Sequence, residues 1–118
     1  MDIEQYRDYC IAKRGVTEEF PFDINTLVFK VMGKMFALTD VDEFSSINLK
    51  CDPERSASLR ESNPGITGGY HMSKLHWNTV ATDGSVSDPL IIELIDHSYE
   101  LVVAGLTKKL RAELEKLC

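Results

Sequence analysis

The sequence predicts a two-layer α+β domain with an antiparallel sheet, in the element order α-β-β-β-α-β-β-α. Short segments in which apolar and polar residues alternate are separated by turn signals of only a few residues, which is typical of antiparallel strands. Helix-capping residues and apolar residues at spacings of three and four stand before, between and after these segments. Strands joined by short turns and flanked by helices favour a helical layer packed on one sheet.

The first helix is expected to begin after Asp2 and to end at Gly15. Asp2 can cap the helix with Gln5 at its third position, and apolar residues then recur on one face. Glycine is common directly after a helix because it adopts left-handed backbone angles. The next segment contains Phe20 and Phe22, and we expect it to be an irregular connection that packs both rings onto the core.

Three strands are expected over residues 27–31, 35–38 and 46–51. The first two form a hairpin around Gly33-Lys34, and the third follows an acidic turn. A short helix then runs to about residue 61, with Asp52 as its cap and Pro53 at its first position. Asn63-Pro64-Gly65 breaks the chain again.

Two more strands are expected near residues 67–72 and 76–81, and a final helix over residues 88–117. Asp88-Pro89 carries the cap signal of this helix, and Asp96-His97-Ser98 is expected to bend or restart it. The sequence shows no internal repeat, low-complexity tract or composition change. We therefore expect residues 1–118 to form a single domain.

Composition excludes several classes of protein. The net charge of −6 argues against a strong nonspecific hold on nucleic acid, although residues 24–82 are balanced, with six Lys and Arg against six Asp and Glu. No apolar run approaches the ~20 residues that span a bilayer, and the first residues lack a signal-peptide pattern. We expect a cytoplasmic protein without membrane contact. Cys10 and Cys51 are expected to be buried thiols.

Catalytic and metal-binding patterns are weak. His71 and His76 lack a third ligand at a plausible spacing. Ser73 and Ser85 lack the surroundings of a nucleophilic serine, and Gly68-Gly69 lacks the pattern of a phosphate-binding loop. We expect no cofactor and no enzymatic activity. A deep pocket that held both histidines and a carboxylate with a perturbed pKa would favour an enzyme instead.

The chemistry-bearing residues gather between Gly68 and Trp77. Trp77 is expected to anchor the core, as a lone tryptophan in a small domain commonly does. Tyr70, Lys74 and the two histidines could form an aromatic and cationic patch that stacks on bases and pairs with phosphate. The two interpretations are compatible, because Trp77 can hold the strand while its neighbours point outward.

These residues carry a family resemblance. The matching segments, in order, are Phe20-Pro21-Phe22, Val28-Phe29-Lys30-Val31, Gly33 to Leu38, Leu49-Lys50 with Pro53-Glu54, Leu59-Arg60-Glu61, Pro64-Gly65, Tyr70-His71-Met72 through Lys74 to His76-Trp77, and Ser98-Tyr99 within residues 96–102. Together they span almost the whole chain. The sequence is similar to the MmcQ/YjbR family of small bacterial proteins, in which asparagine usually replaces Ser73 and arginine often replaces Leu75.

The resemblance implies a fold akin to secretion chaperones and, loosely, to frataxin-like proteins. It also implies a non-enzymatic DNA-binding protein. The expected contacts are Lys30, Lys34, Lys50, Arg60, Tyr70, His71, Lys74 and His76. Binding would be directed at phosphate, weak and steeply salt-sensitive. The missing positive charge at Leu75 would weaken the phosphate contact and reduce its salt dependence. The alternative is a protein-interaction module that binds a peptide or partner chain on its sheet, which suits an acidic surface better.

Overall fold

The computed structural model describes residues 1–70 and 72–117. The elements in chain order are α1 (Ile3–Ile11), β1 (Val16–Glu19), β2 (Thr26–Val31), β3 (Lys34–Asp40), β4 (Ser46–Lys50), α2 (Pro53–Ser62), β5 (Ile66–Gly68), β6 (Trp77–Ala81), α3 (Asp88–Ala104) and α4 (Lys108–Glu115). The strands form one six-stranded sheet in the order β1-β2-β3-β4-β6-β5, and each neighbouring pair is antiparallel. The predicted α+β class with an antiparallel sheet is confirmed.

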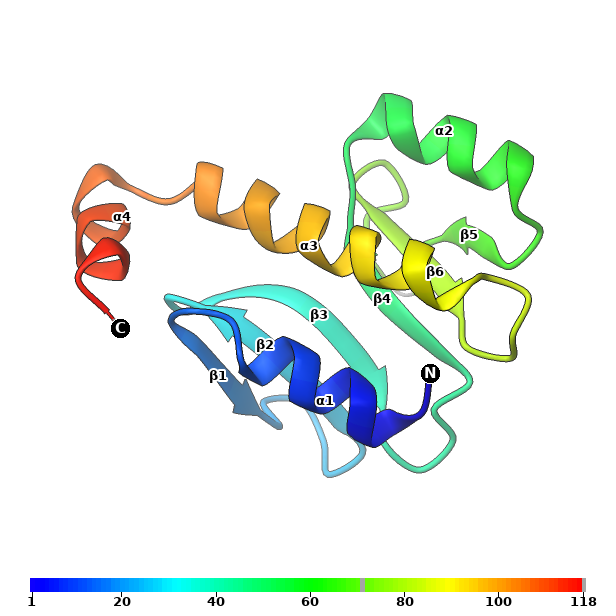
Figure 1. Cartoon of the computed structure of the whole chain (residues 1–118), viewed down its shortest axis with the longest axis horizontal. Helices are drawn as coiled ribbons and strands as arrows, with labels where there is room; N and C mark the ends of the chain where they lie inside the picture. The colour runs from blue at the N-terminus through cyan, green and yellow to red at the C-terminus, as the bar shows by residue number, and fades with distance from the viewer. Residues whose placement is uncertain (71, 118) are drawn as a thin grey trace.

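The helices α1 and α3 cover one face of this sheet (Figure 1). The core lies between them and the strands, where Tyr6 and Ile95 from the helices meet Phe29 and Ile47 from the sheet, each at most 1% exposed. Along β4, Ile47 and Leu49 enter this core, so the alternation of the strand directs Asn48 and Lys50 to the opposite face. We call that opposite face the open face.

The sheet contains a strand that the sequence did not predict. β1 is an edge strand that pairs with β2, with Val16 opposite Val31 and Glu19 opposite Val28. The sequence Val-Thr-Glu-Glu has one apolar residue and therefore no readable alternation. Tertiary pairing specifies the strand here, helped by the ion pair between Arg7 of α1 and Glu18.

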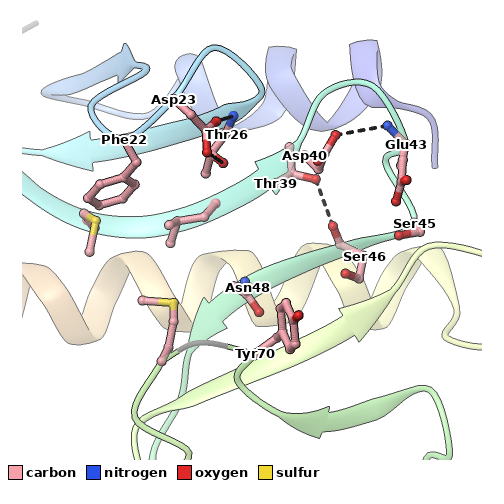
Figure 2. A pocket seen from close by; sticks show the side chains of 13 residues that line it. Phe22, Asp23, Thr26, Thr39, Asp40, Glu43, Ser45, Ser46, Asn48 and Tyr70 are labelled. Atoms are coloured by element: carbon pink, nitrogen blue, oxygen red, sulfur yellow. Dashed lines mark hydrogen bonds between the residues drawn. The ribbon is translucent and has the colours of Figure 1, made fainter.

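The connection after β1 also differs from its prediction. Phe20 and Phe22 do not pack onto the core, because they remain 50% and 64% exposed. The Phe22 side chain lies over the open face, on the side of the sheet away from the helices (Figure 2). A sequence pattern marks these rings as apolar, but it cannot say on which side of the sheet a loop lies.

The final helix is interrupted later than predicted. α3 continues through Asp96-His97-Ser98, and the break falls between Ala104 and Thr107, which caps α4. The polar residues do not end α3 because their side chains find partners outside the helix. Asp96 accepts from Tyr9 Oη at 2.6 Å and from Lys13 Nζ at 2.5 Å, and Ser98 bonds the sheet backbone.

The two strands of the Gly68–Trp77 region are shorter than predicted. β5 ends at Gly68 and β6 begins at Trp77, so residues 69–76 form a loop of which residue 71 lies outside the described residues. Cys10 and Cys51 are buried as expected, and burial raises the pKa of the Cys10 thiol to about 12. Within the described ranges, no helix is long and apolar enough to cross a bilayer.

Candidate functional site

A cavity of about 700 Å³ lies over the open face of the sheet. Its floor includes Met35 and Leu38 of β3 and Asn48 of β4. Phe22 stands over one side and Tyr70 over the other, with β3 and β4 running between them (Figure 2). The cavity therefore has a floor of apolar and polar side chains and an exposed aromatic ring on each of two sides.

The Phe22 side of the cavity is held by the next residue, Asp23. Its Oδ1 accepts from the backbone N–H groups of Asn25 and Thr26 at 2.9 and 2.7 Å. These bonds keep the pKa of Asp23 below its usual range, because they favour the ionised carboxylate. The turn fixes the entry to β2, so Phe22 projects from an ordered loop.

The Tyr70 side is held by polar groups of the open face. The backbone N–H of Tyr70 donates to Thr79 Oγ1 at 2.9 Å, and Thr79 Oγ1 donates to Asn48 Oδ1 at 2.6 Å. Thr79 and Asn48 are cross-strand partners on β6 and β4. Tyr70 is thus tied to the strand that forms part of the cavity floor.

The glycine pair Gly68-Gly69 serves packing in this structure. Gly69 donates its N–H to the Trp77 carbonyl at 2.8 Å, and a Cβ placed on Gly69 would lie 2.7 Å from the Trp77 Cβ. Lys74 folds back over the loop and donates from Nζ to the Gly69 carbonyl at 3.0 Å. The loop can close only because residue 69 has no side chain.

Arg60 of α2 braces the same loop from the helix side. Its Nε donates to Asn78 Oδ1 at 2.8 Å, and its guanidinium also donates to the carbonyls of Lys74 and Trp77. Asn78 is 2% exposed and donates its amide to Ser56 Oγ of α2 at 3.1 Å. Arg60 therefore acts as a structural residue that joins α2 to β6 and to the loop.

The cavity is electrostatically uneven. Asp23, Asp40 and Glu43 line it at the end where β2 begins and β3 ends, and the described lining residues include no Lys or Arg. At the other end of the open face, register places Lys30 opposite Met35 and Lys50 opposite Trp77. The open face thus runs from a carboxylate end to an amine end.

The structure separates the predicted DNA contacts into different groups. Lys30 and Lys50 lie on the open face, where Lys30 pairs with Glu19 at 3.3 Å. Lys34 is exposed at the hairpin after β2, in register with core-side Val31. Arg60 of α2 and Lys74 both donate to backbone carbonyls of the loop at residues 69–76. The exposed His76 lies in the same loop, and Tyr70 lines the cavity. The predicted residue His71 lies outside the described residues.

Sequence reasoning missed much of the cavity. It assigned Phe22 to the core, and it did not single out Met35, Leu38 or Asn48 for binding. A usable signal existed in β2 and β3, since two predicted strands with apolar residues on both faces indicate a second covered surface. Trp77, expected in the core, is half-buried at the amine end of the open face.

The described residues show no group of three or more His, Cys, Asp and Glu side chains placed to hold a metal ion. Cys51 is buried at the start of the connection to α2, and its N–H donates to the His76 carbonyl. The candidate site is thus the cavity over the open face, with its apolar and acidic lining residues.

Known proteins are similar to this chain in sequence and in fold. The family model described as YjbR matches residues 11–101. The protein YjbR of Escherichia coli K12 is 33% identical over 118 residues, which cover 99% of this chain and 100% of that protein. YyaQ of Bacillus subtilis is 35% identical over 98 residues, 83% of this chain and 79% of YyaQ.

A crystal structure of the Deinococcus radiodurans protein DR2400, with the family-model domain DUF419, superimposes with a TM-score of 0.89 at 44% identity. The match covers 96% of this chain and 87% of that one. The sequence is thus similar, and the arrangement of strands and helices is shared, along nearly the whole chain. The chain belongs to the YjbR family.

Proposed function

We propose that the protein is a non-enzymatic, cytoplasmic binding module that takes up a segment of a partner protein on the open face of its sheet. The observation that carries this proposal is the cavity of about 700 Å³ between Phe22 and Tyr70, on the face that α1 and α3 leave uncovered. Its volume lies within the ~300–1,000 Å³ of ordinary binding pockets.

Exposed apolar side chains support a macromolecular partner. Phe22 and Tyr70, which line the cavity, are 64% and 68% exposed, and Phe20 in the same loop as Phe22 is 50% exposed. Clusters of exposed apolar residues mark interaction surfaces, because leaving them in water has a cost that a partner removes. Aromatic residues in particular supply much of the binding energy of protein interfaces.

Peptide display followed by a binding measurement tests this proposal. A random twelve-residue peptide library is selected on the intact protein, and selected peptides are titrated against the wild type and the Tyr70→Ala and Phe22→Ala variants. Each substitution is expected to weaken binding by about tenfold or more, as for an aromatic anchor. Ile24→Ala and Leu75→Ala are matched controls, since both residues are exposed but do not line the cavity.

Two results would count against a peptide-binding module. One is a selection that enriches no sequence on the folded protein. The other is a set of peptides whose affinity is unchanged in Tyr70→Ala and Phe22→Ala but falls in the control variants. In the second case the peptides bind elsewhere, and the cavity is not the site.

DNA binding is the second candidate, and one observation favours it. Lys30 and Lys50 share the open face with half-buried Trp77 and exposed Tyr70, so amines and aromatic rings lie on one surface. Contacts of these lysines with phosphate would release counterions and give weak, salt-sensitive binding. The carboxylates at the other end of that face and the pairing of Lys30 with Glu19 oppose it.

Fluorescence anisotropy with duplex and single-stranded DNA at low salt tests this second candidate. Binding at tens of micromolar protein, a decline with added salt and a weaker response in Lys50→Ala would support it, on the scale of nonspecific affinity. Absence of binding to both DNAs under these conditions would eliminate it. The peptide experiments do not depend on this result.

A further inference from the structure

The charge arrangement of the open face identifies the chemistry of the partner segment. We propose that the cavity binds an extended segment with a basic side chain, an apolar side chain and an acidic side chain at alternate positions. This inference rests on the proposed function and specifies its ligand. The basic side chain would lie at the carboxylate end, the apolar one between Phe22 and Tyr70, and the acidic one at the amine end.

The carboxylate end has capacity for a cation. Asp40 uses Oδ1 to accept from the N–H groups of Asp42 and Glu43 at 2.9 and 3.1 Å. Neither Asp40 nor Glu43 forms an ion pair with any described residue. With Asp23 beside them along the lining of the same cavity, a lysine or arginine side chain would meet three carboxylates and no described cation.

The amine end has capacity for an anion. Lys50 also has no ion-pair partner among the described residues, and it extends to the open face two residues after Asn48, which lines the cavity. Lys30 adds a second amine, shared with Glu19. Lys30 and Lys50 therefore complement an acidic side chain.

The spacing of the two ends sets the spacing of the partner's charges. Ser46 lies at the carboxylate end of β4 and Lys50 at its other end, four residues apart. Four residues of extended chain span roughly 13 Å. An extended partner would match this length with charges at positions i and i+4, and the side chain at i+2 points to the same face.

Synthetic peptides of nine residues, acetylated and amidated, provide the test. The first carries Lys, Leu and Glu at positions three, five and seven, with Thr and Ser elsewhere. In the second, Gln replaces both charged residues, and in the third, Glu replaces the Lys. Titration of the ¹⁵N-labelled protein, followed by the amide signals of Asn48, Tyr70 and Thr79, reports both affinity and location.

We expect the Lys-Leu-Glu peptide to bind about five- to tenfold more tightly than the Gln-Leu-Gln peptide, from two ion pairs of modest strength. The double variant Asp40→Asn, Glu43→Gln should remove about half of the difference in binding free energy between these two peptides. Lys50→Gln should remove the other half. Asn at position 40 keeps the Oδ1 acceptor of the turn, so the loop should stay folded. Asp42→Asn, which does not line the cavity, is the control.

The outcomes distinguish this inference from the proposed function. Equal binding of the charged and neutral peptides, with both lost in Tyr70→Ala, overturns the charge rule and leaves a peptide-binding site. Tighter binding of the Glu-Leu-Glu peptide also overturns it. If none of the three peptides binds but display-selected peptides do, the partner chemistry is wrong, whereas failure of the display selection removes the site itself.

Discussion

Arg60 and Asn78 form a hydrogen bond of 2.8 Å between α2 and β6, from Nε to Oδ1. The bond satisfies a carboxamide that is 2% exposed, and the same guanidinium reaches the Lys74 and Trp77 carbonyls. The guanidinium of Arg60, a residue expected to contact DNA, is thus bonded to the buried Asn78 and to the loop backbone. Its positive charge stabilises the loop that positions Tyr70.

We predict that Arg60→Ala lowers the free energy of unfolding by about 2–3 kcal/mol, because a bond to a charged donor is lost and the buried Asn78 Oδ1 is left unpaired. Urea denaturation measures the change. Arg55→Ala in the same helix is the control, since its ion pair with Glu93 is exposed and worth about 0–1 kcal/mol. Equal losses in both variants would mean that Arg60 is only a surface residue.

Ser98 provides the second prediction. Its Oγ donates to the Phe36 carbonyl at 2.6 Å and accepts from the Lys50 N–H at 2.9 Å, where the pairing of β3 with β4 has ended. Ser98→Ala should cost about 2–4 kcal/mol, because two backbone groups lose their partner. Hydrogen exchange of the Lys50 amide should accelerate. Ser58→Ala on the exposed side of α2 should change neither quantity.

Gly69 provides the third prediction. In Gly69→Ala the new methyl group would lie 2.7 Å from the Trp77 Cβ, so the loop must move away from β6. We expect a loss of about 1–3 kcal/mol in unfolding free energy and a red shift of Trp77 fluorescence, as for an overpacked site. Gly105→Ala has no atom within 3.5 Å of the new methyl group and should be near neutral. Unchanged emission in Gly69→Ala would contradict the packing role.

The pH dependence of stability provides the fourth prediction. His97 accepts from the Asp52 N–H at 3.2 Å. Burial, and then the charge of Arg55, lowers the pKa of His97 below its ordinary value of 6.5, and this outweighs nearby Asp52, Glu100 and Glu93. The unfolded chain therefore binds the proton more tightly than the folded protein. Stability should be full above pH 6.5 and should decline as the pH falls from there toward the folded pKa.

Urea denaturation between pH 5 and 8 measures that slope against His97→Gln, which does not titrate and can still accept from the Asp52 N–H. The difference in unfolding free energy between wild type and variant should shrink or reverse on acidification. A difference that stays constant across this range would show that the pKa of His97 is the same in the folded and unfolded states.

The sequence by itself determined the α+β class, most of the elements and the family. Asp2 and Asp52 mark helix starts through local capping chemistry, whereas α3 is capped by Ser87 and not by the predicted Asp88, which is its first residue. The alternation in β4 reports which residues enter the core. These signals are local, because each depends on residues within a few positions of one another. The same locality explains why Val16–Glu19 was not predicted, since its pairing with β2 joins residues nine to fifteen positions apart.

Tertiary structure decided what those residues do. Phe22 and Tyr70 are 48 positions apart, and only the packing of both loops over β3 and β4 makes them two sides of one cavity. Arg60 and Lys50 are both cations in the sequence, yet one bonds a buried amide and the other lies at the open face. Burial and the sides of the sheet follow from the path of the whole chain, so no local pattern distinguished the structural role of Arg60 from the surface position of Lys50.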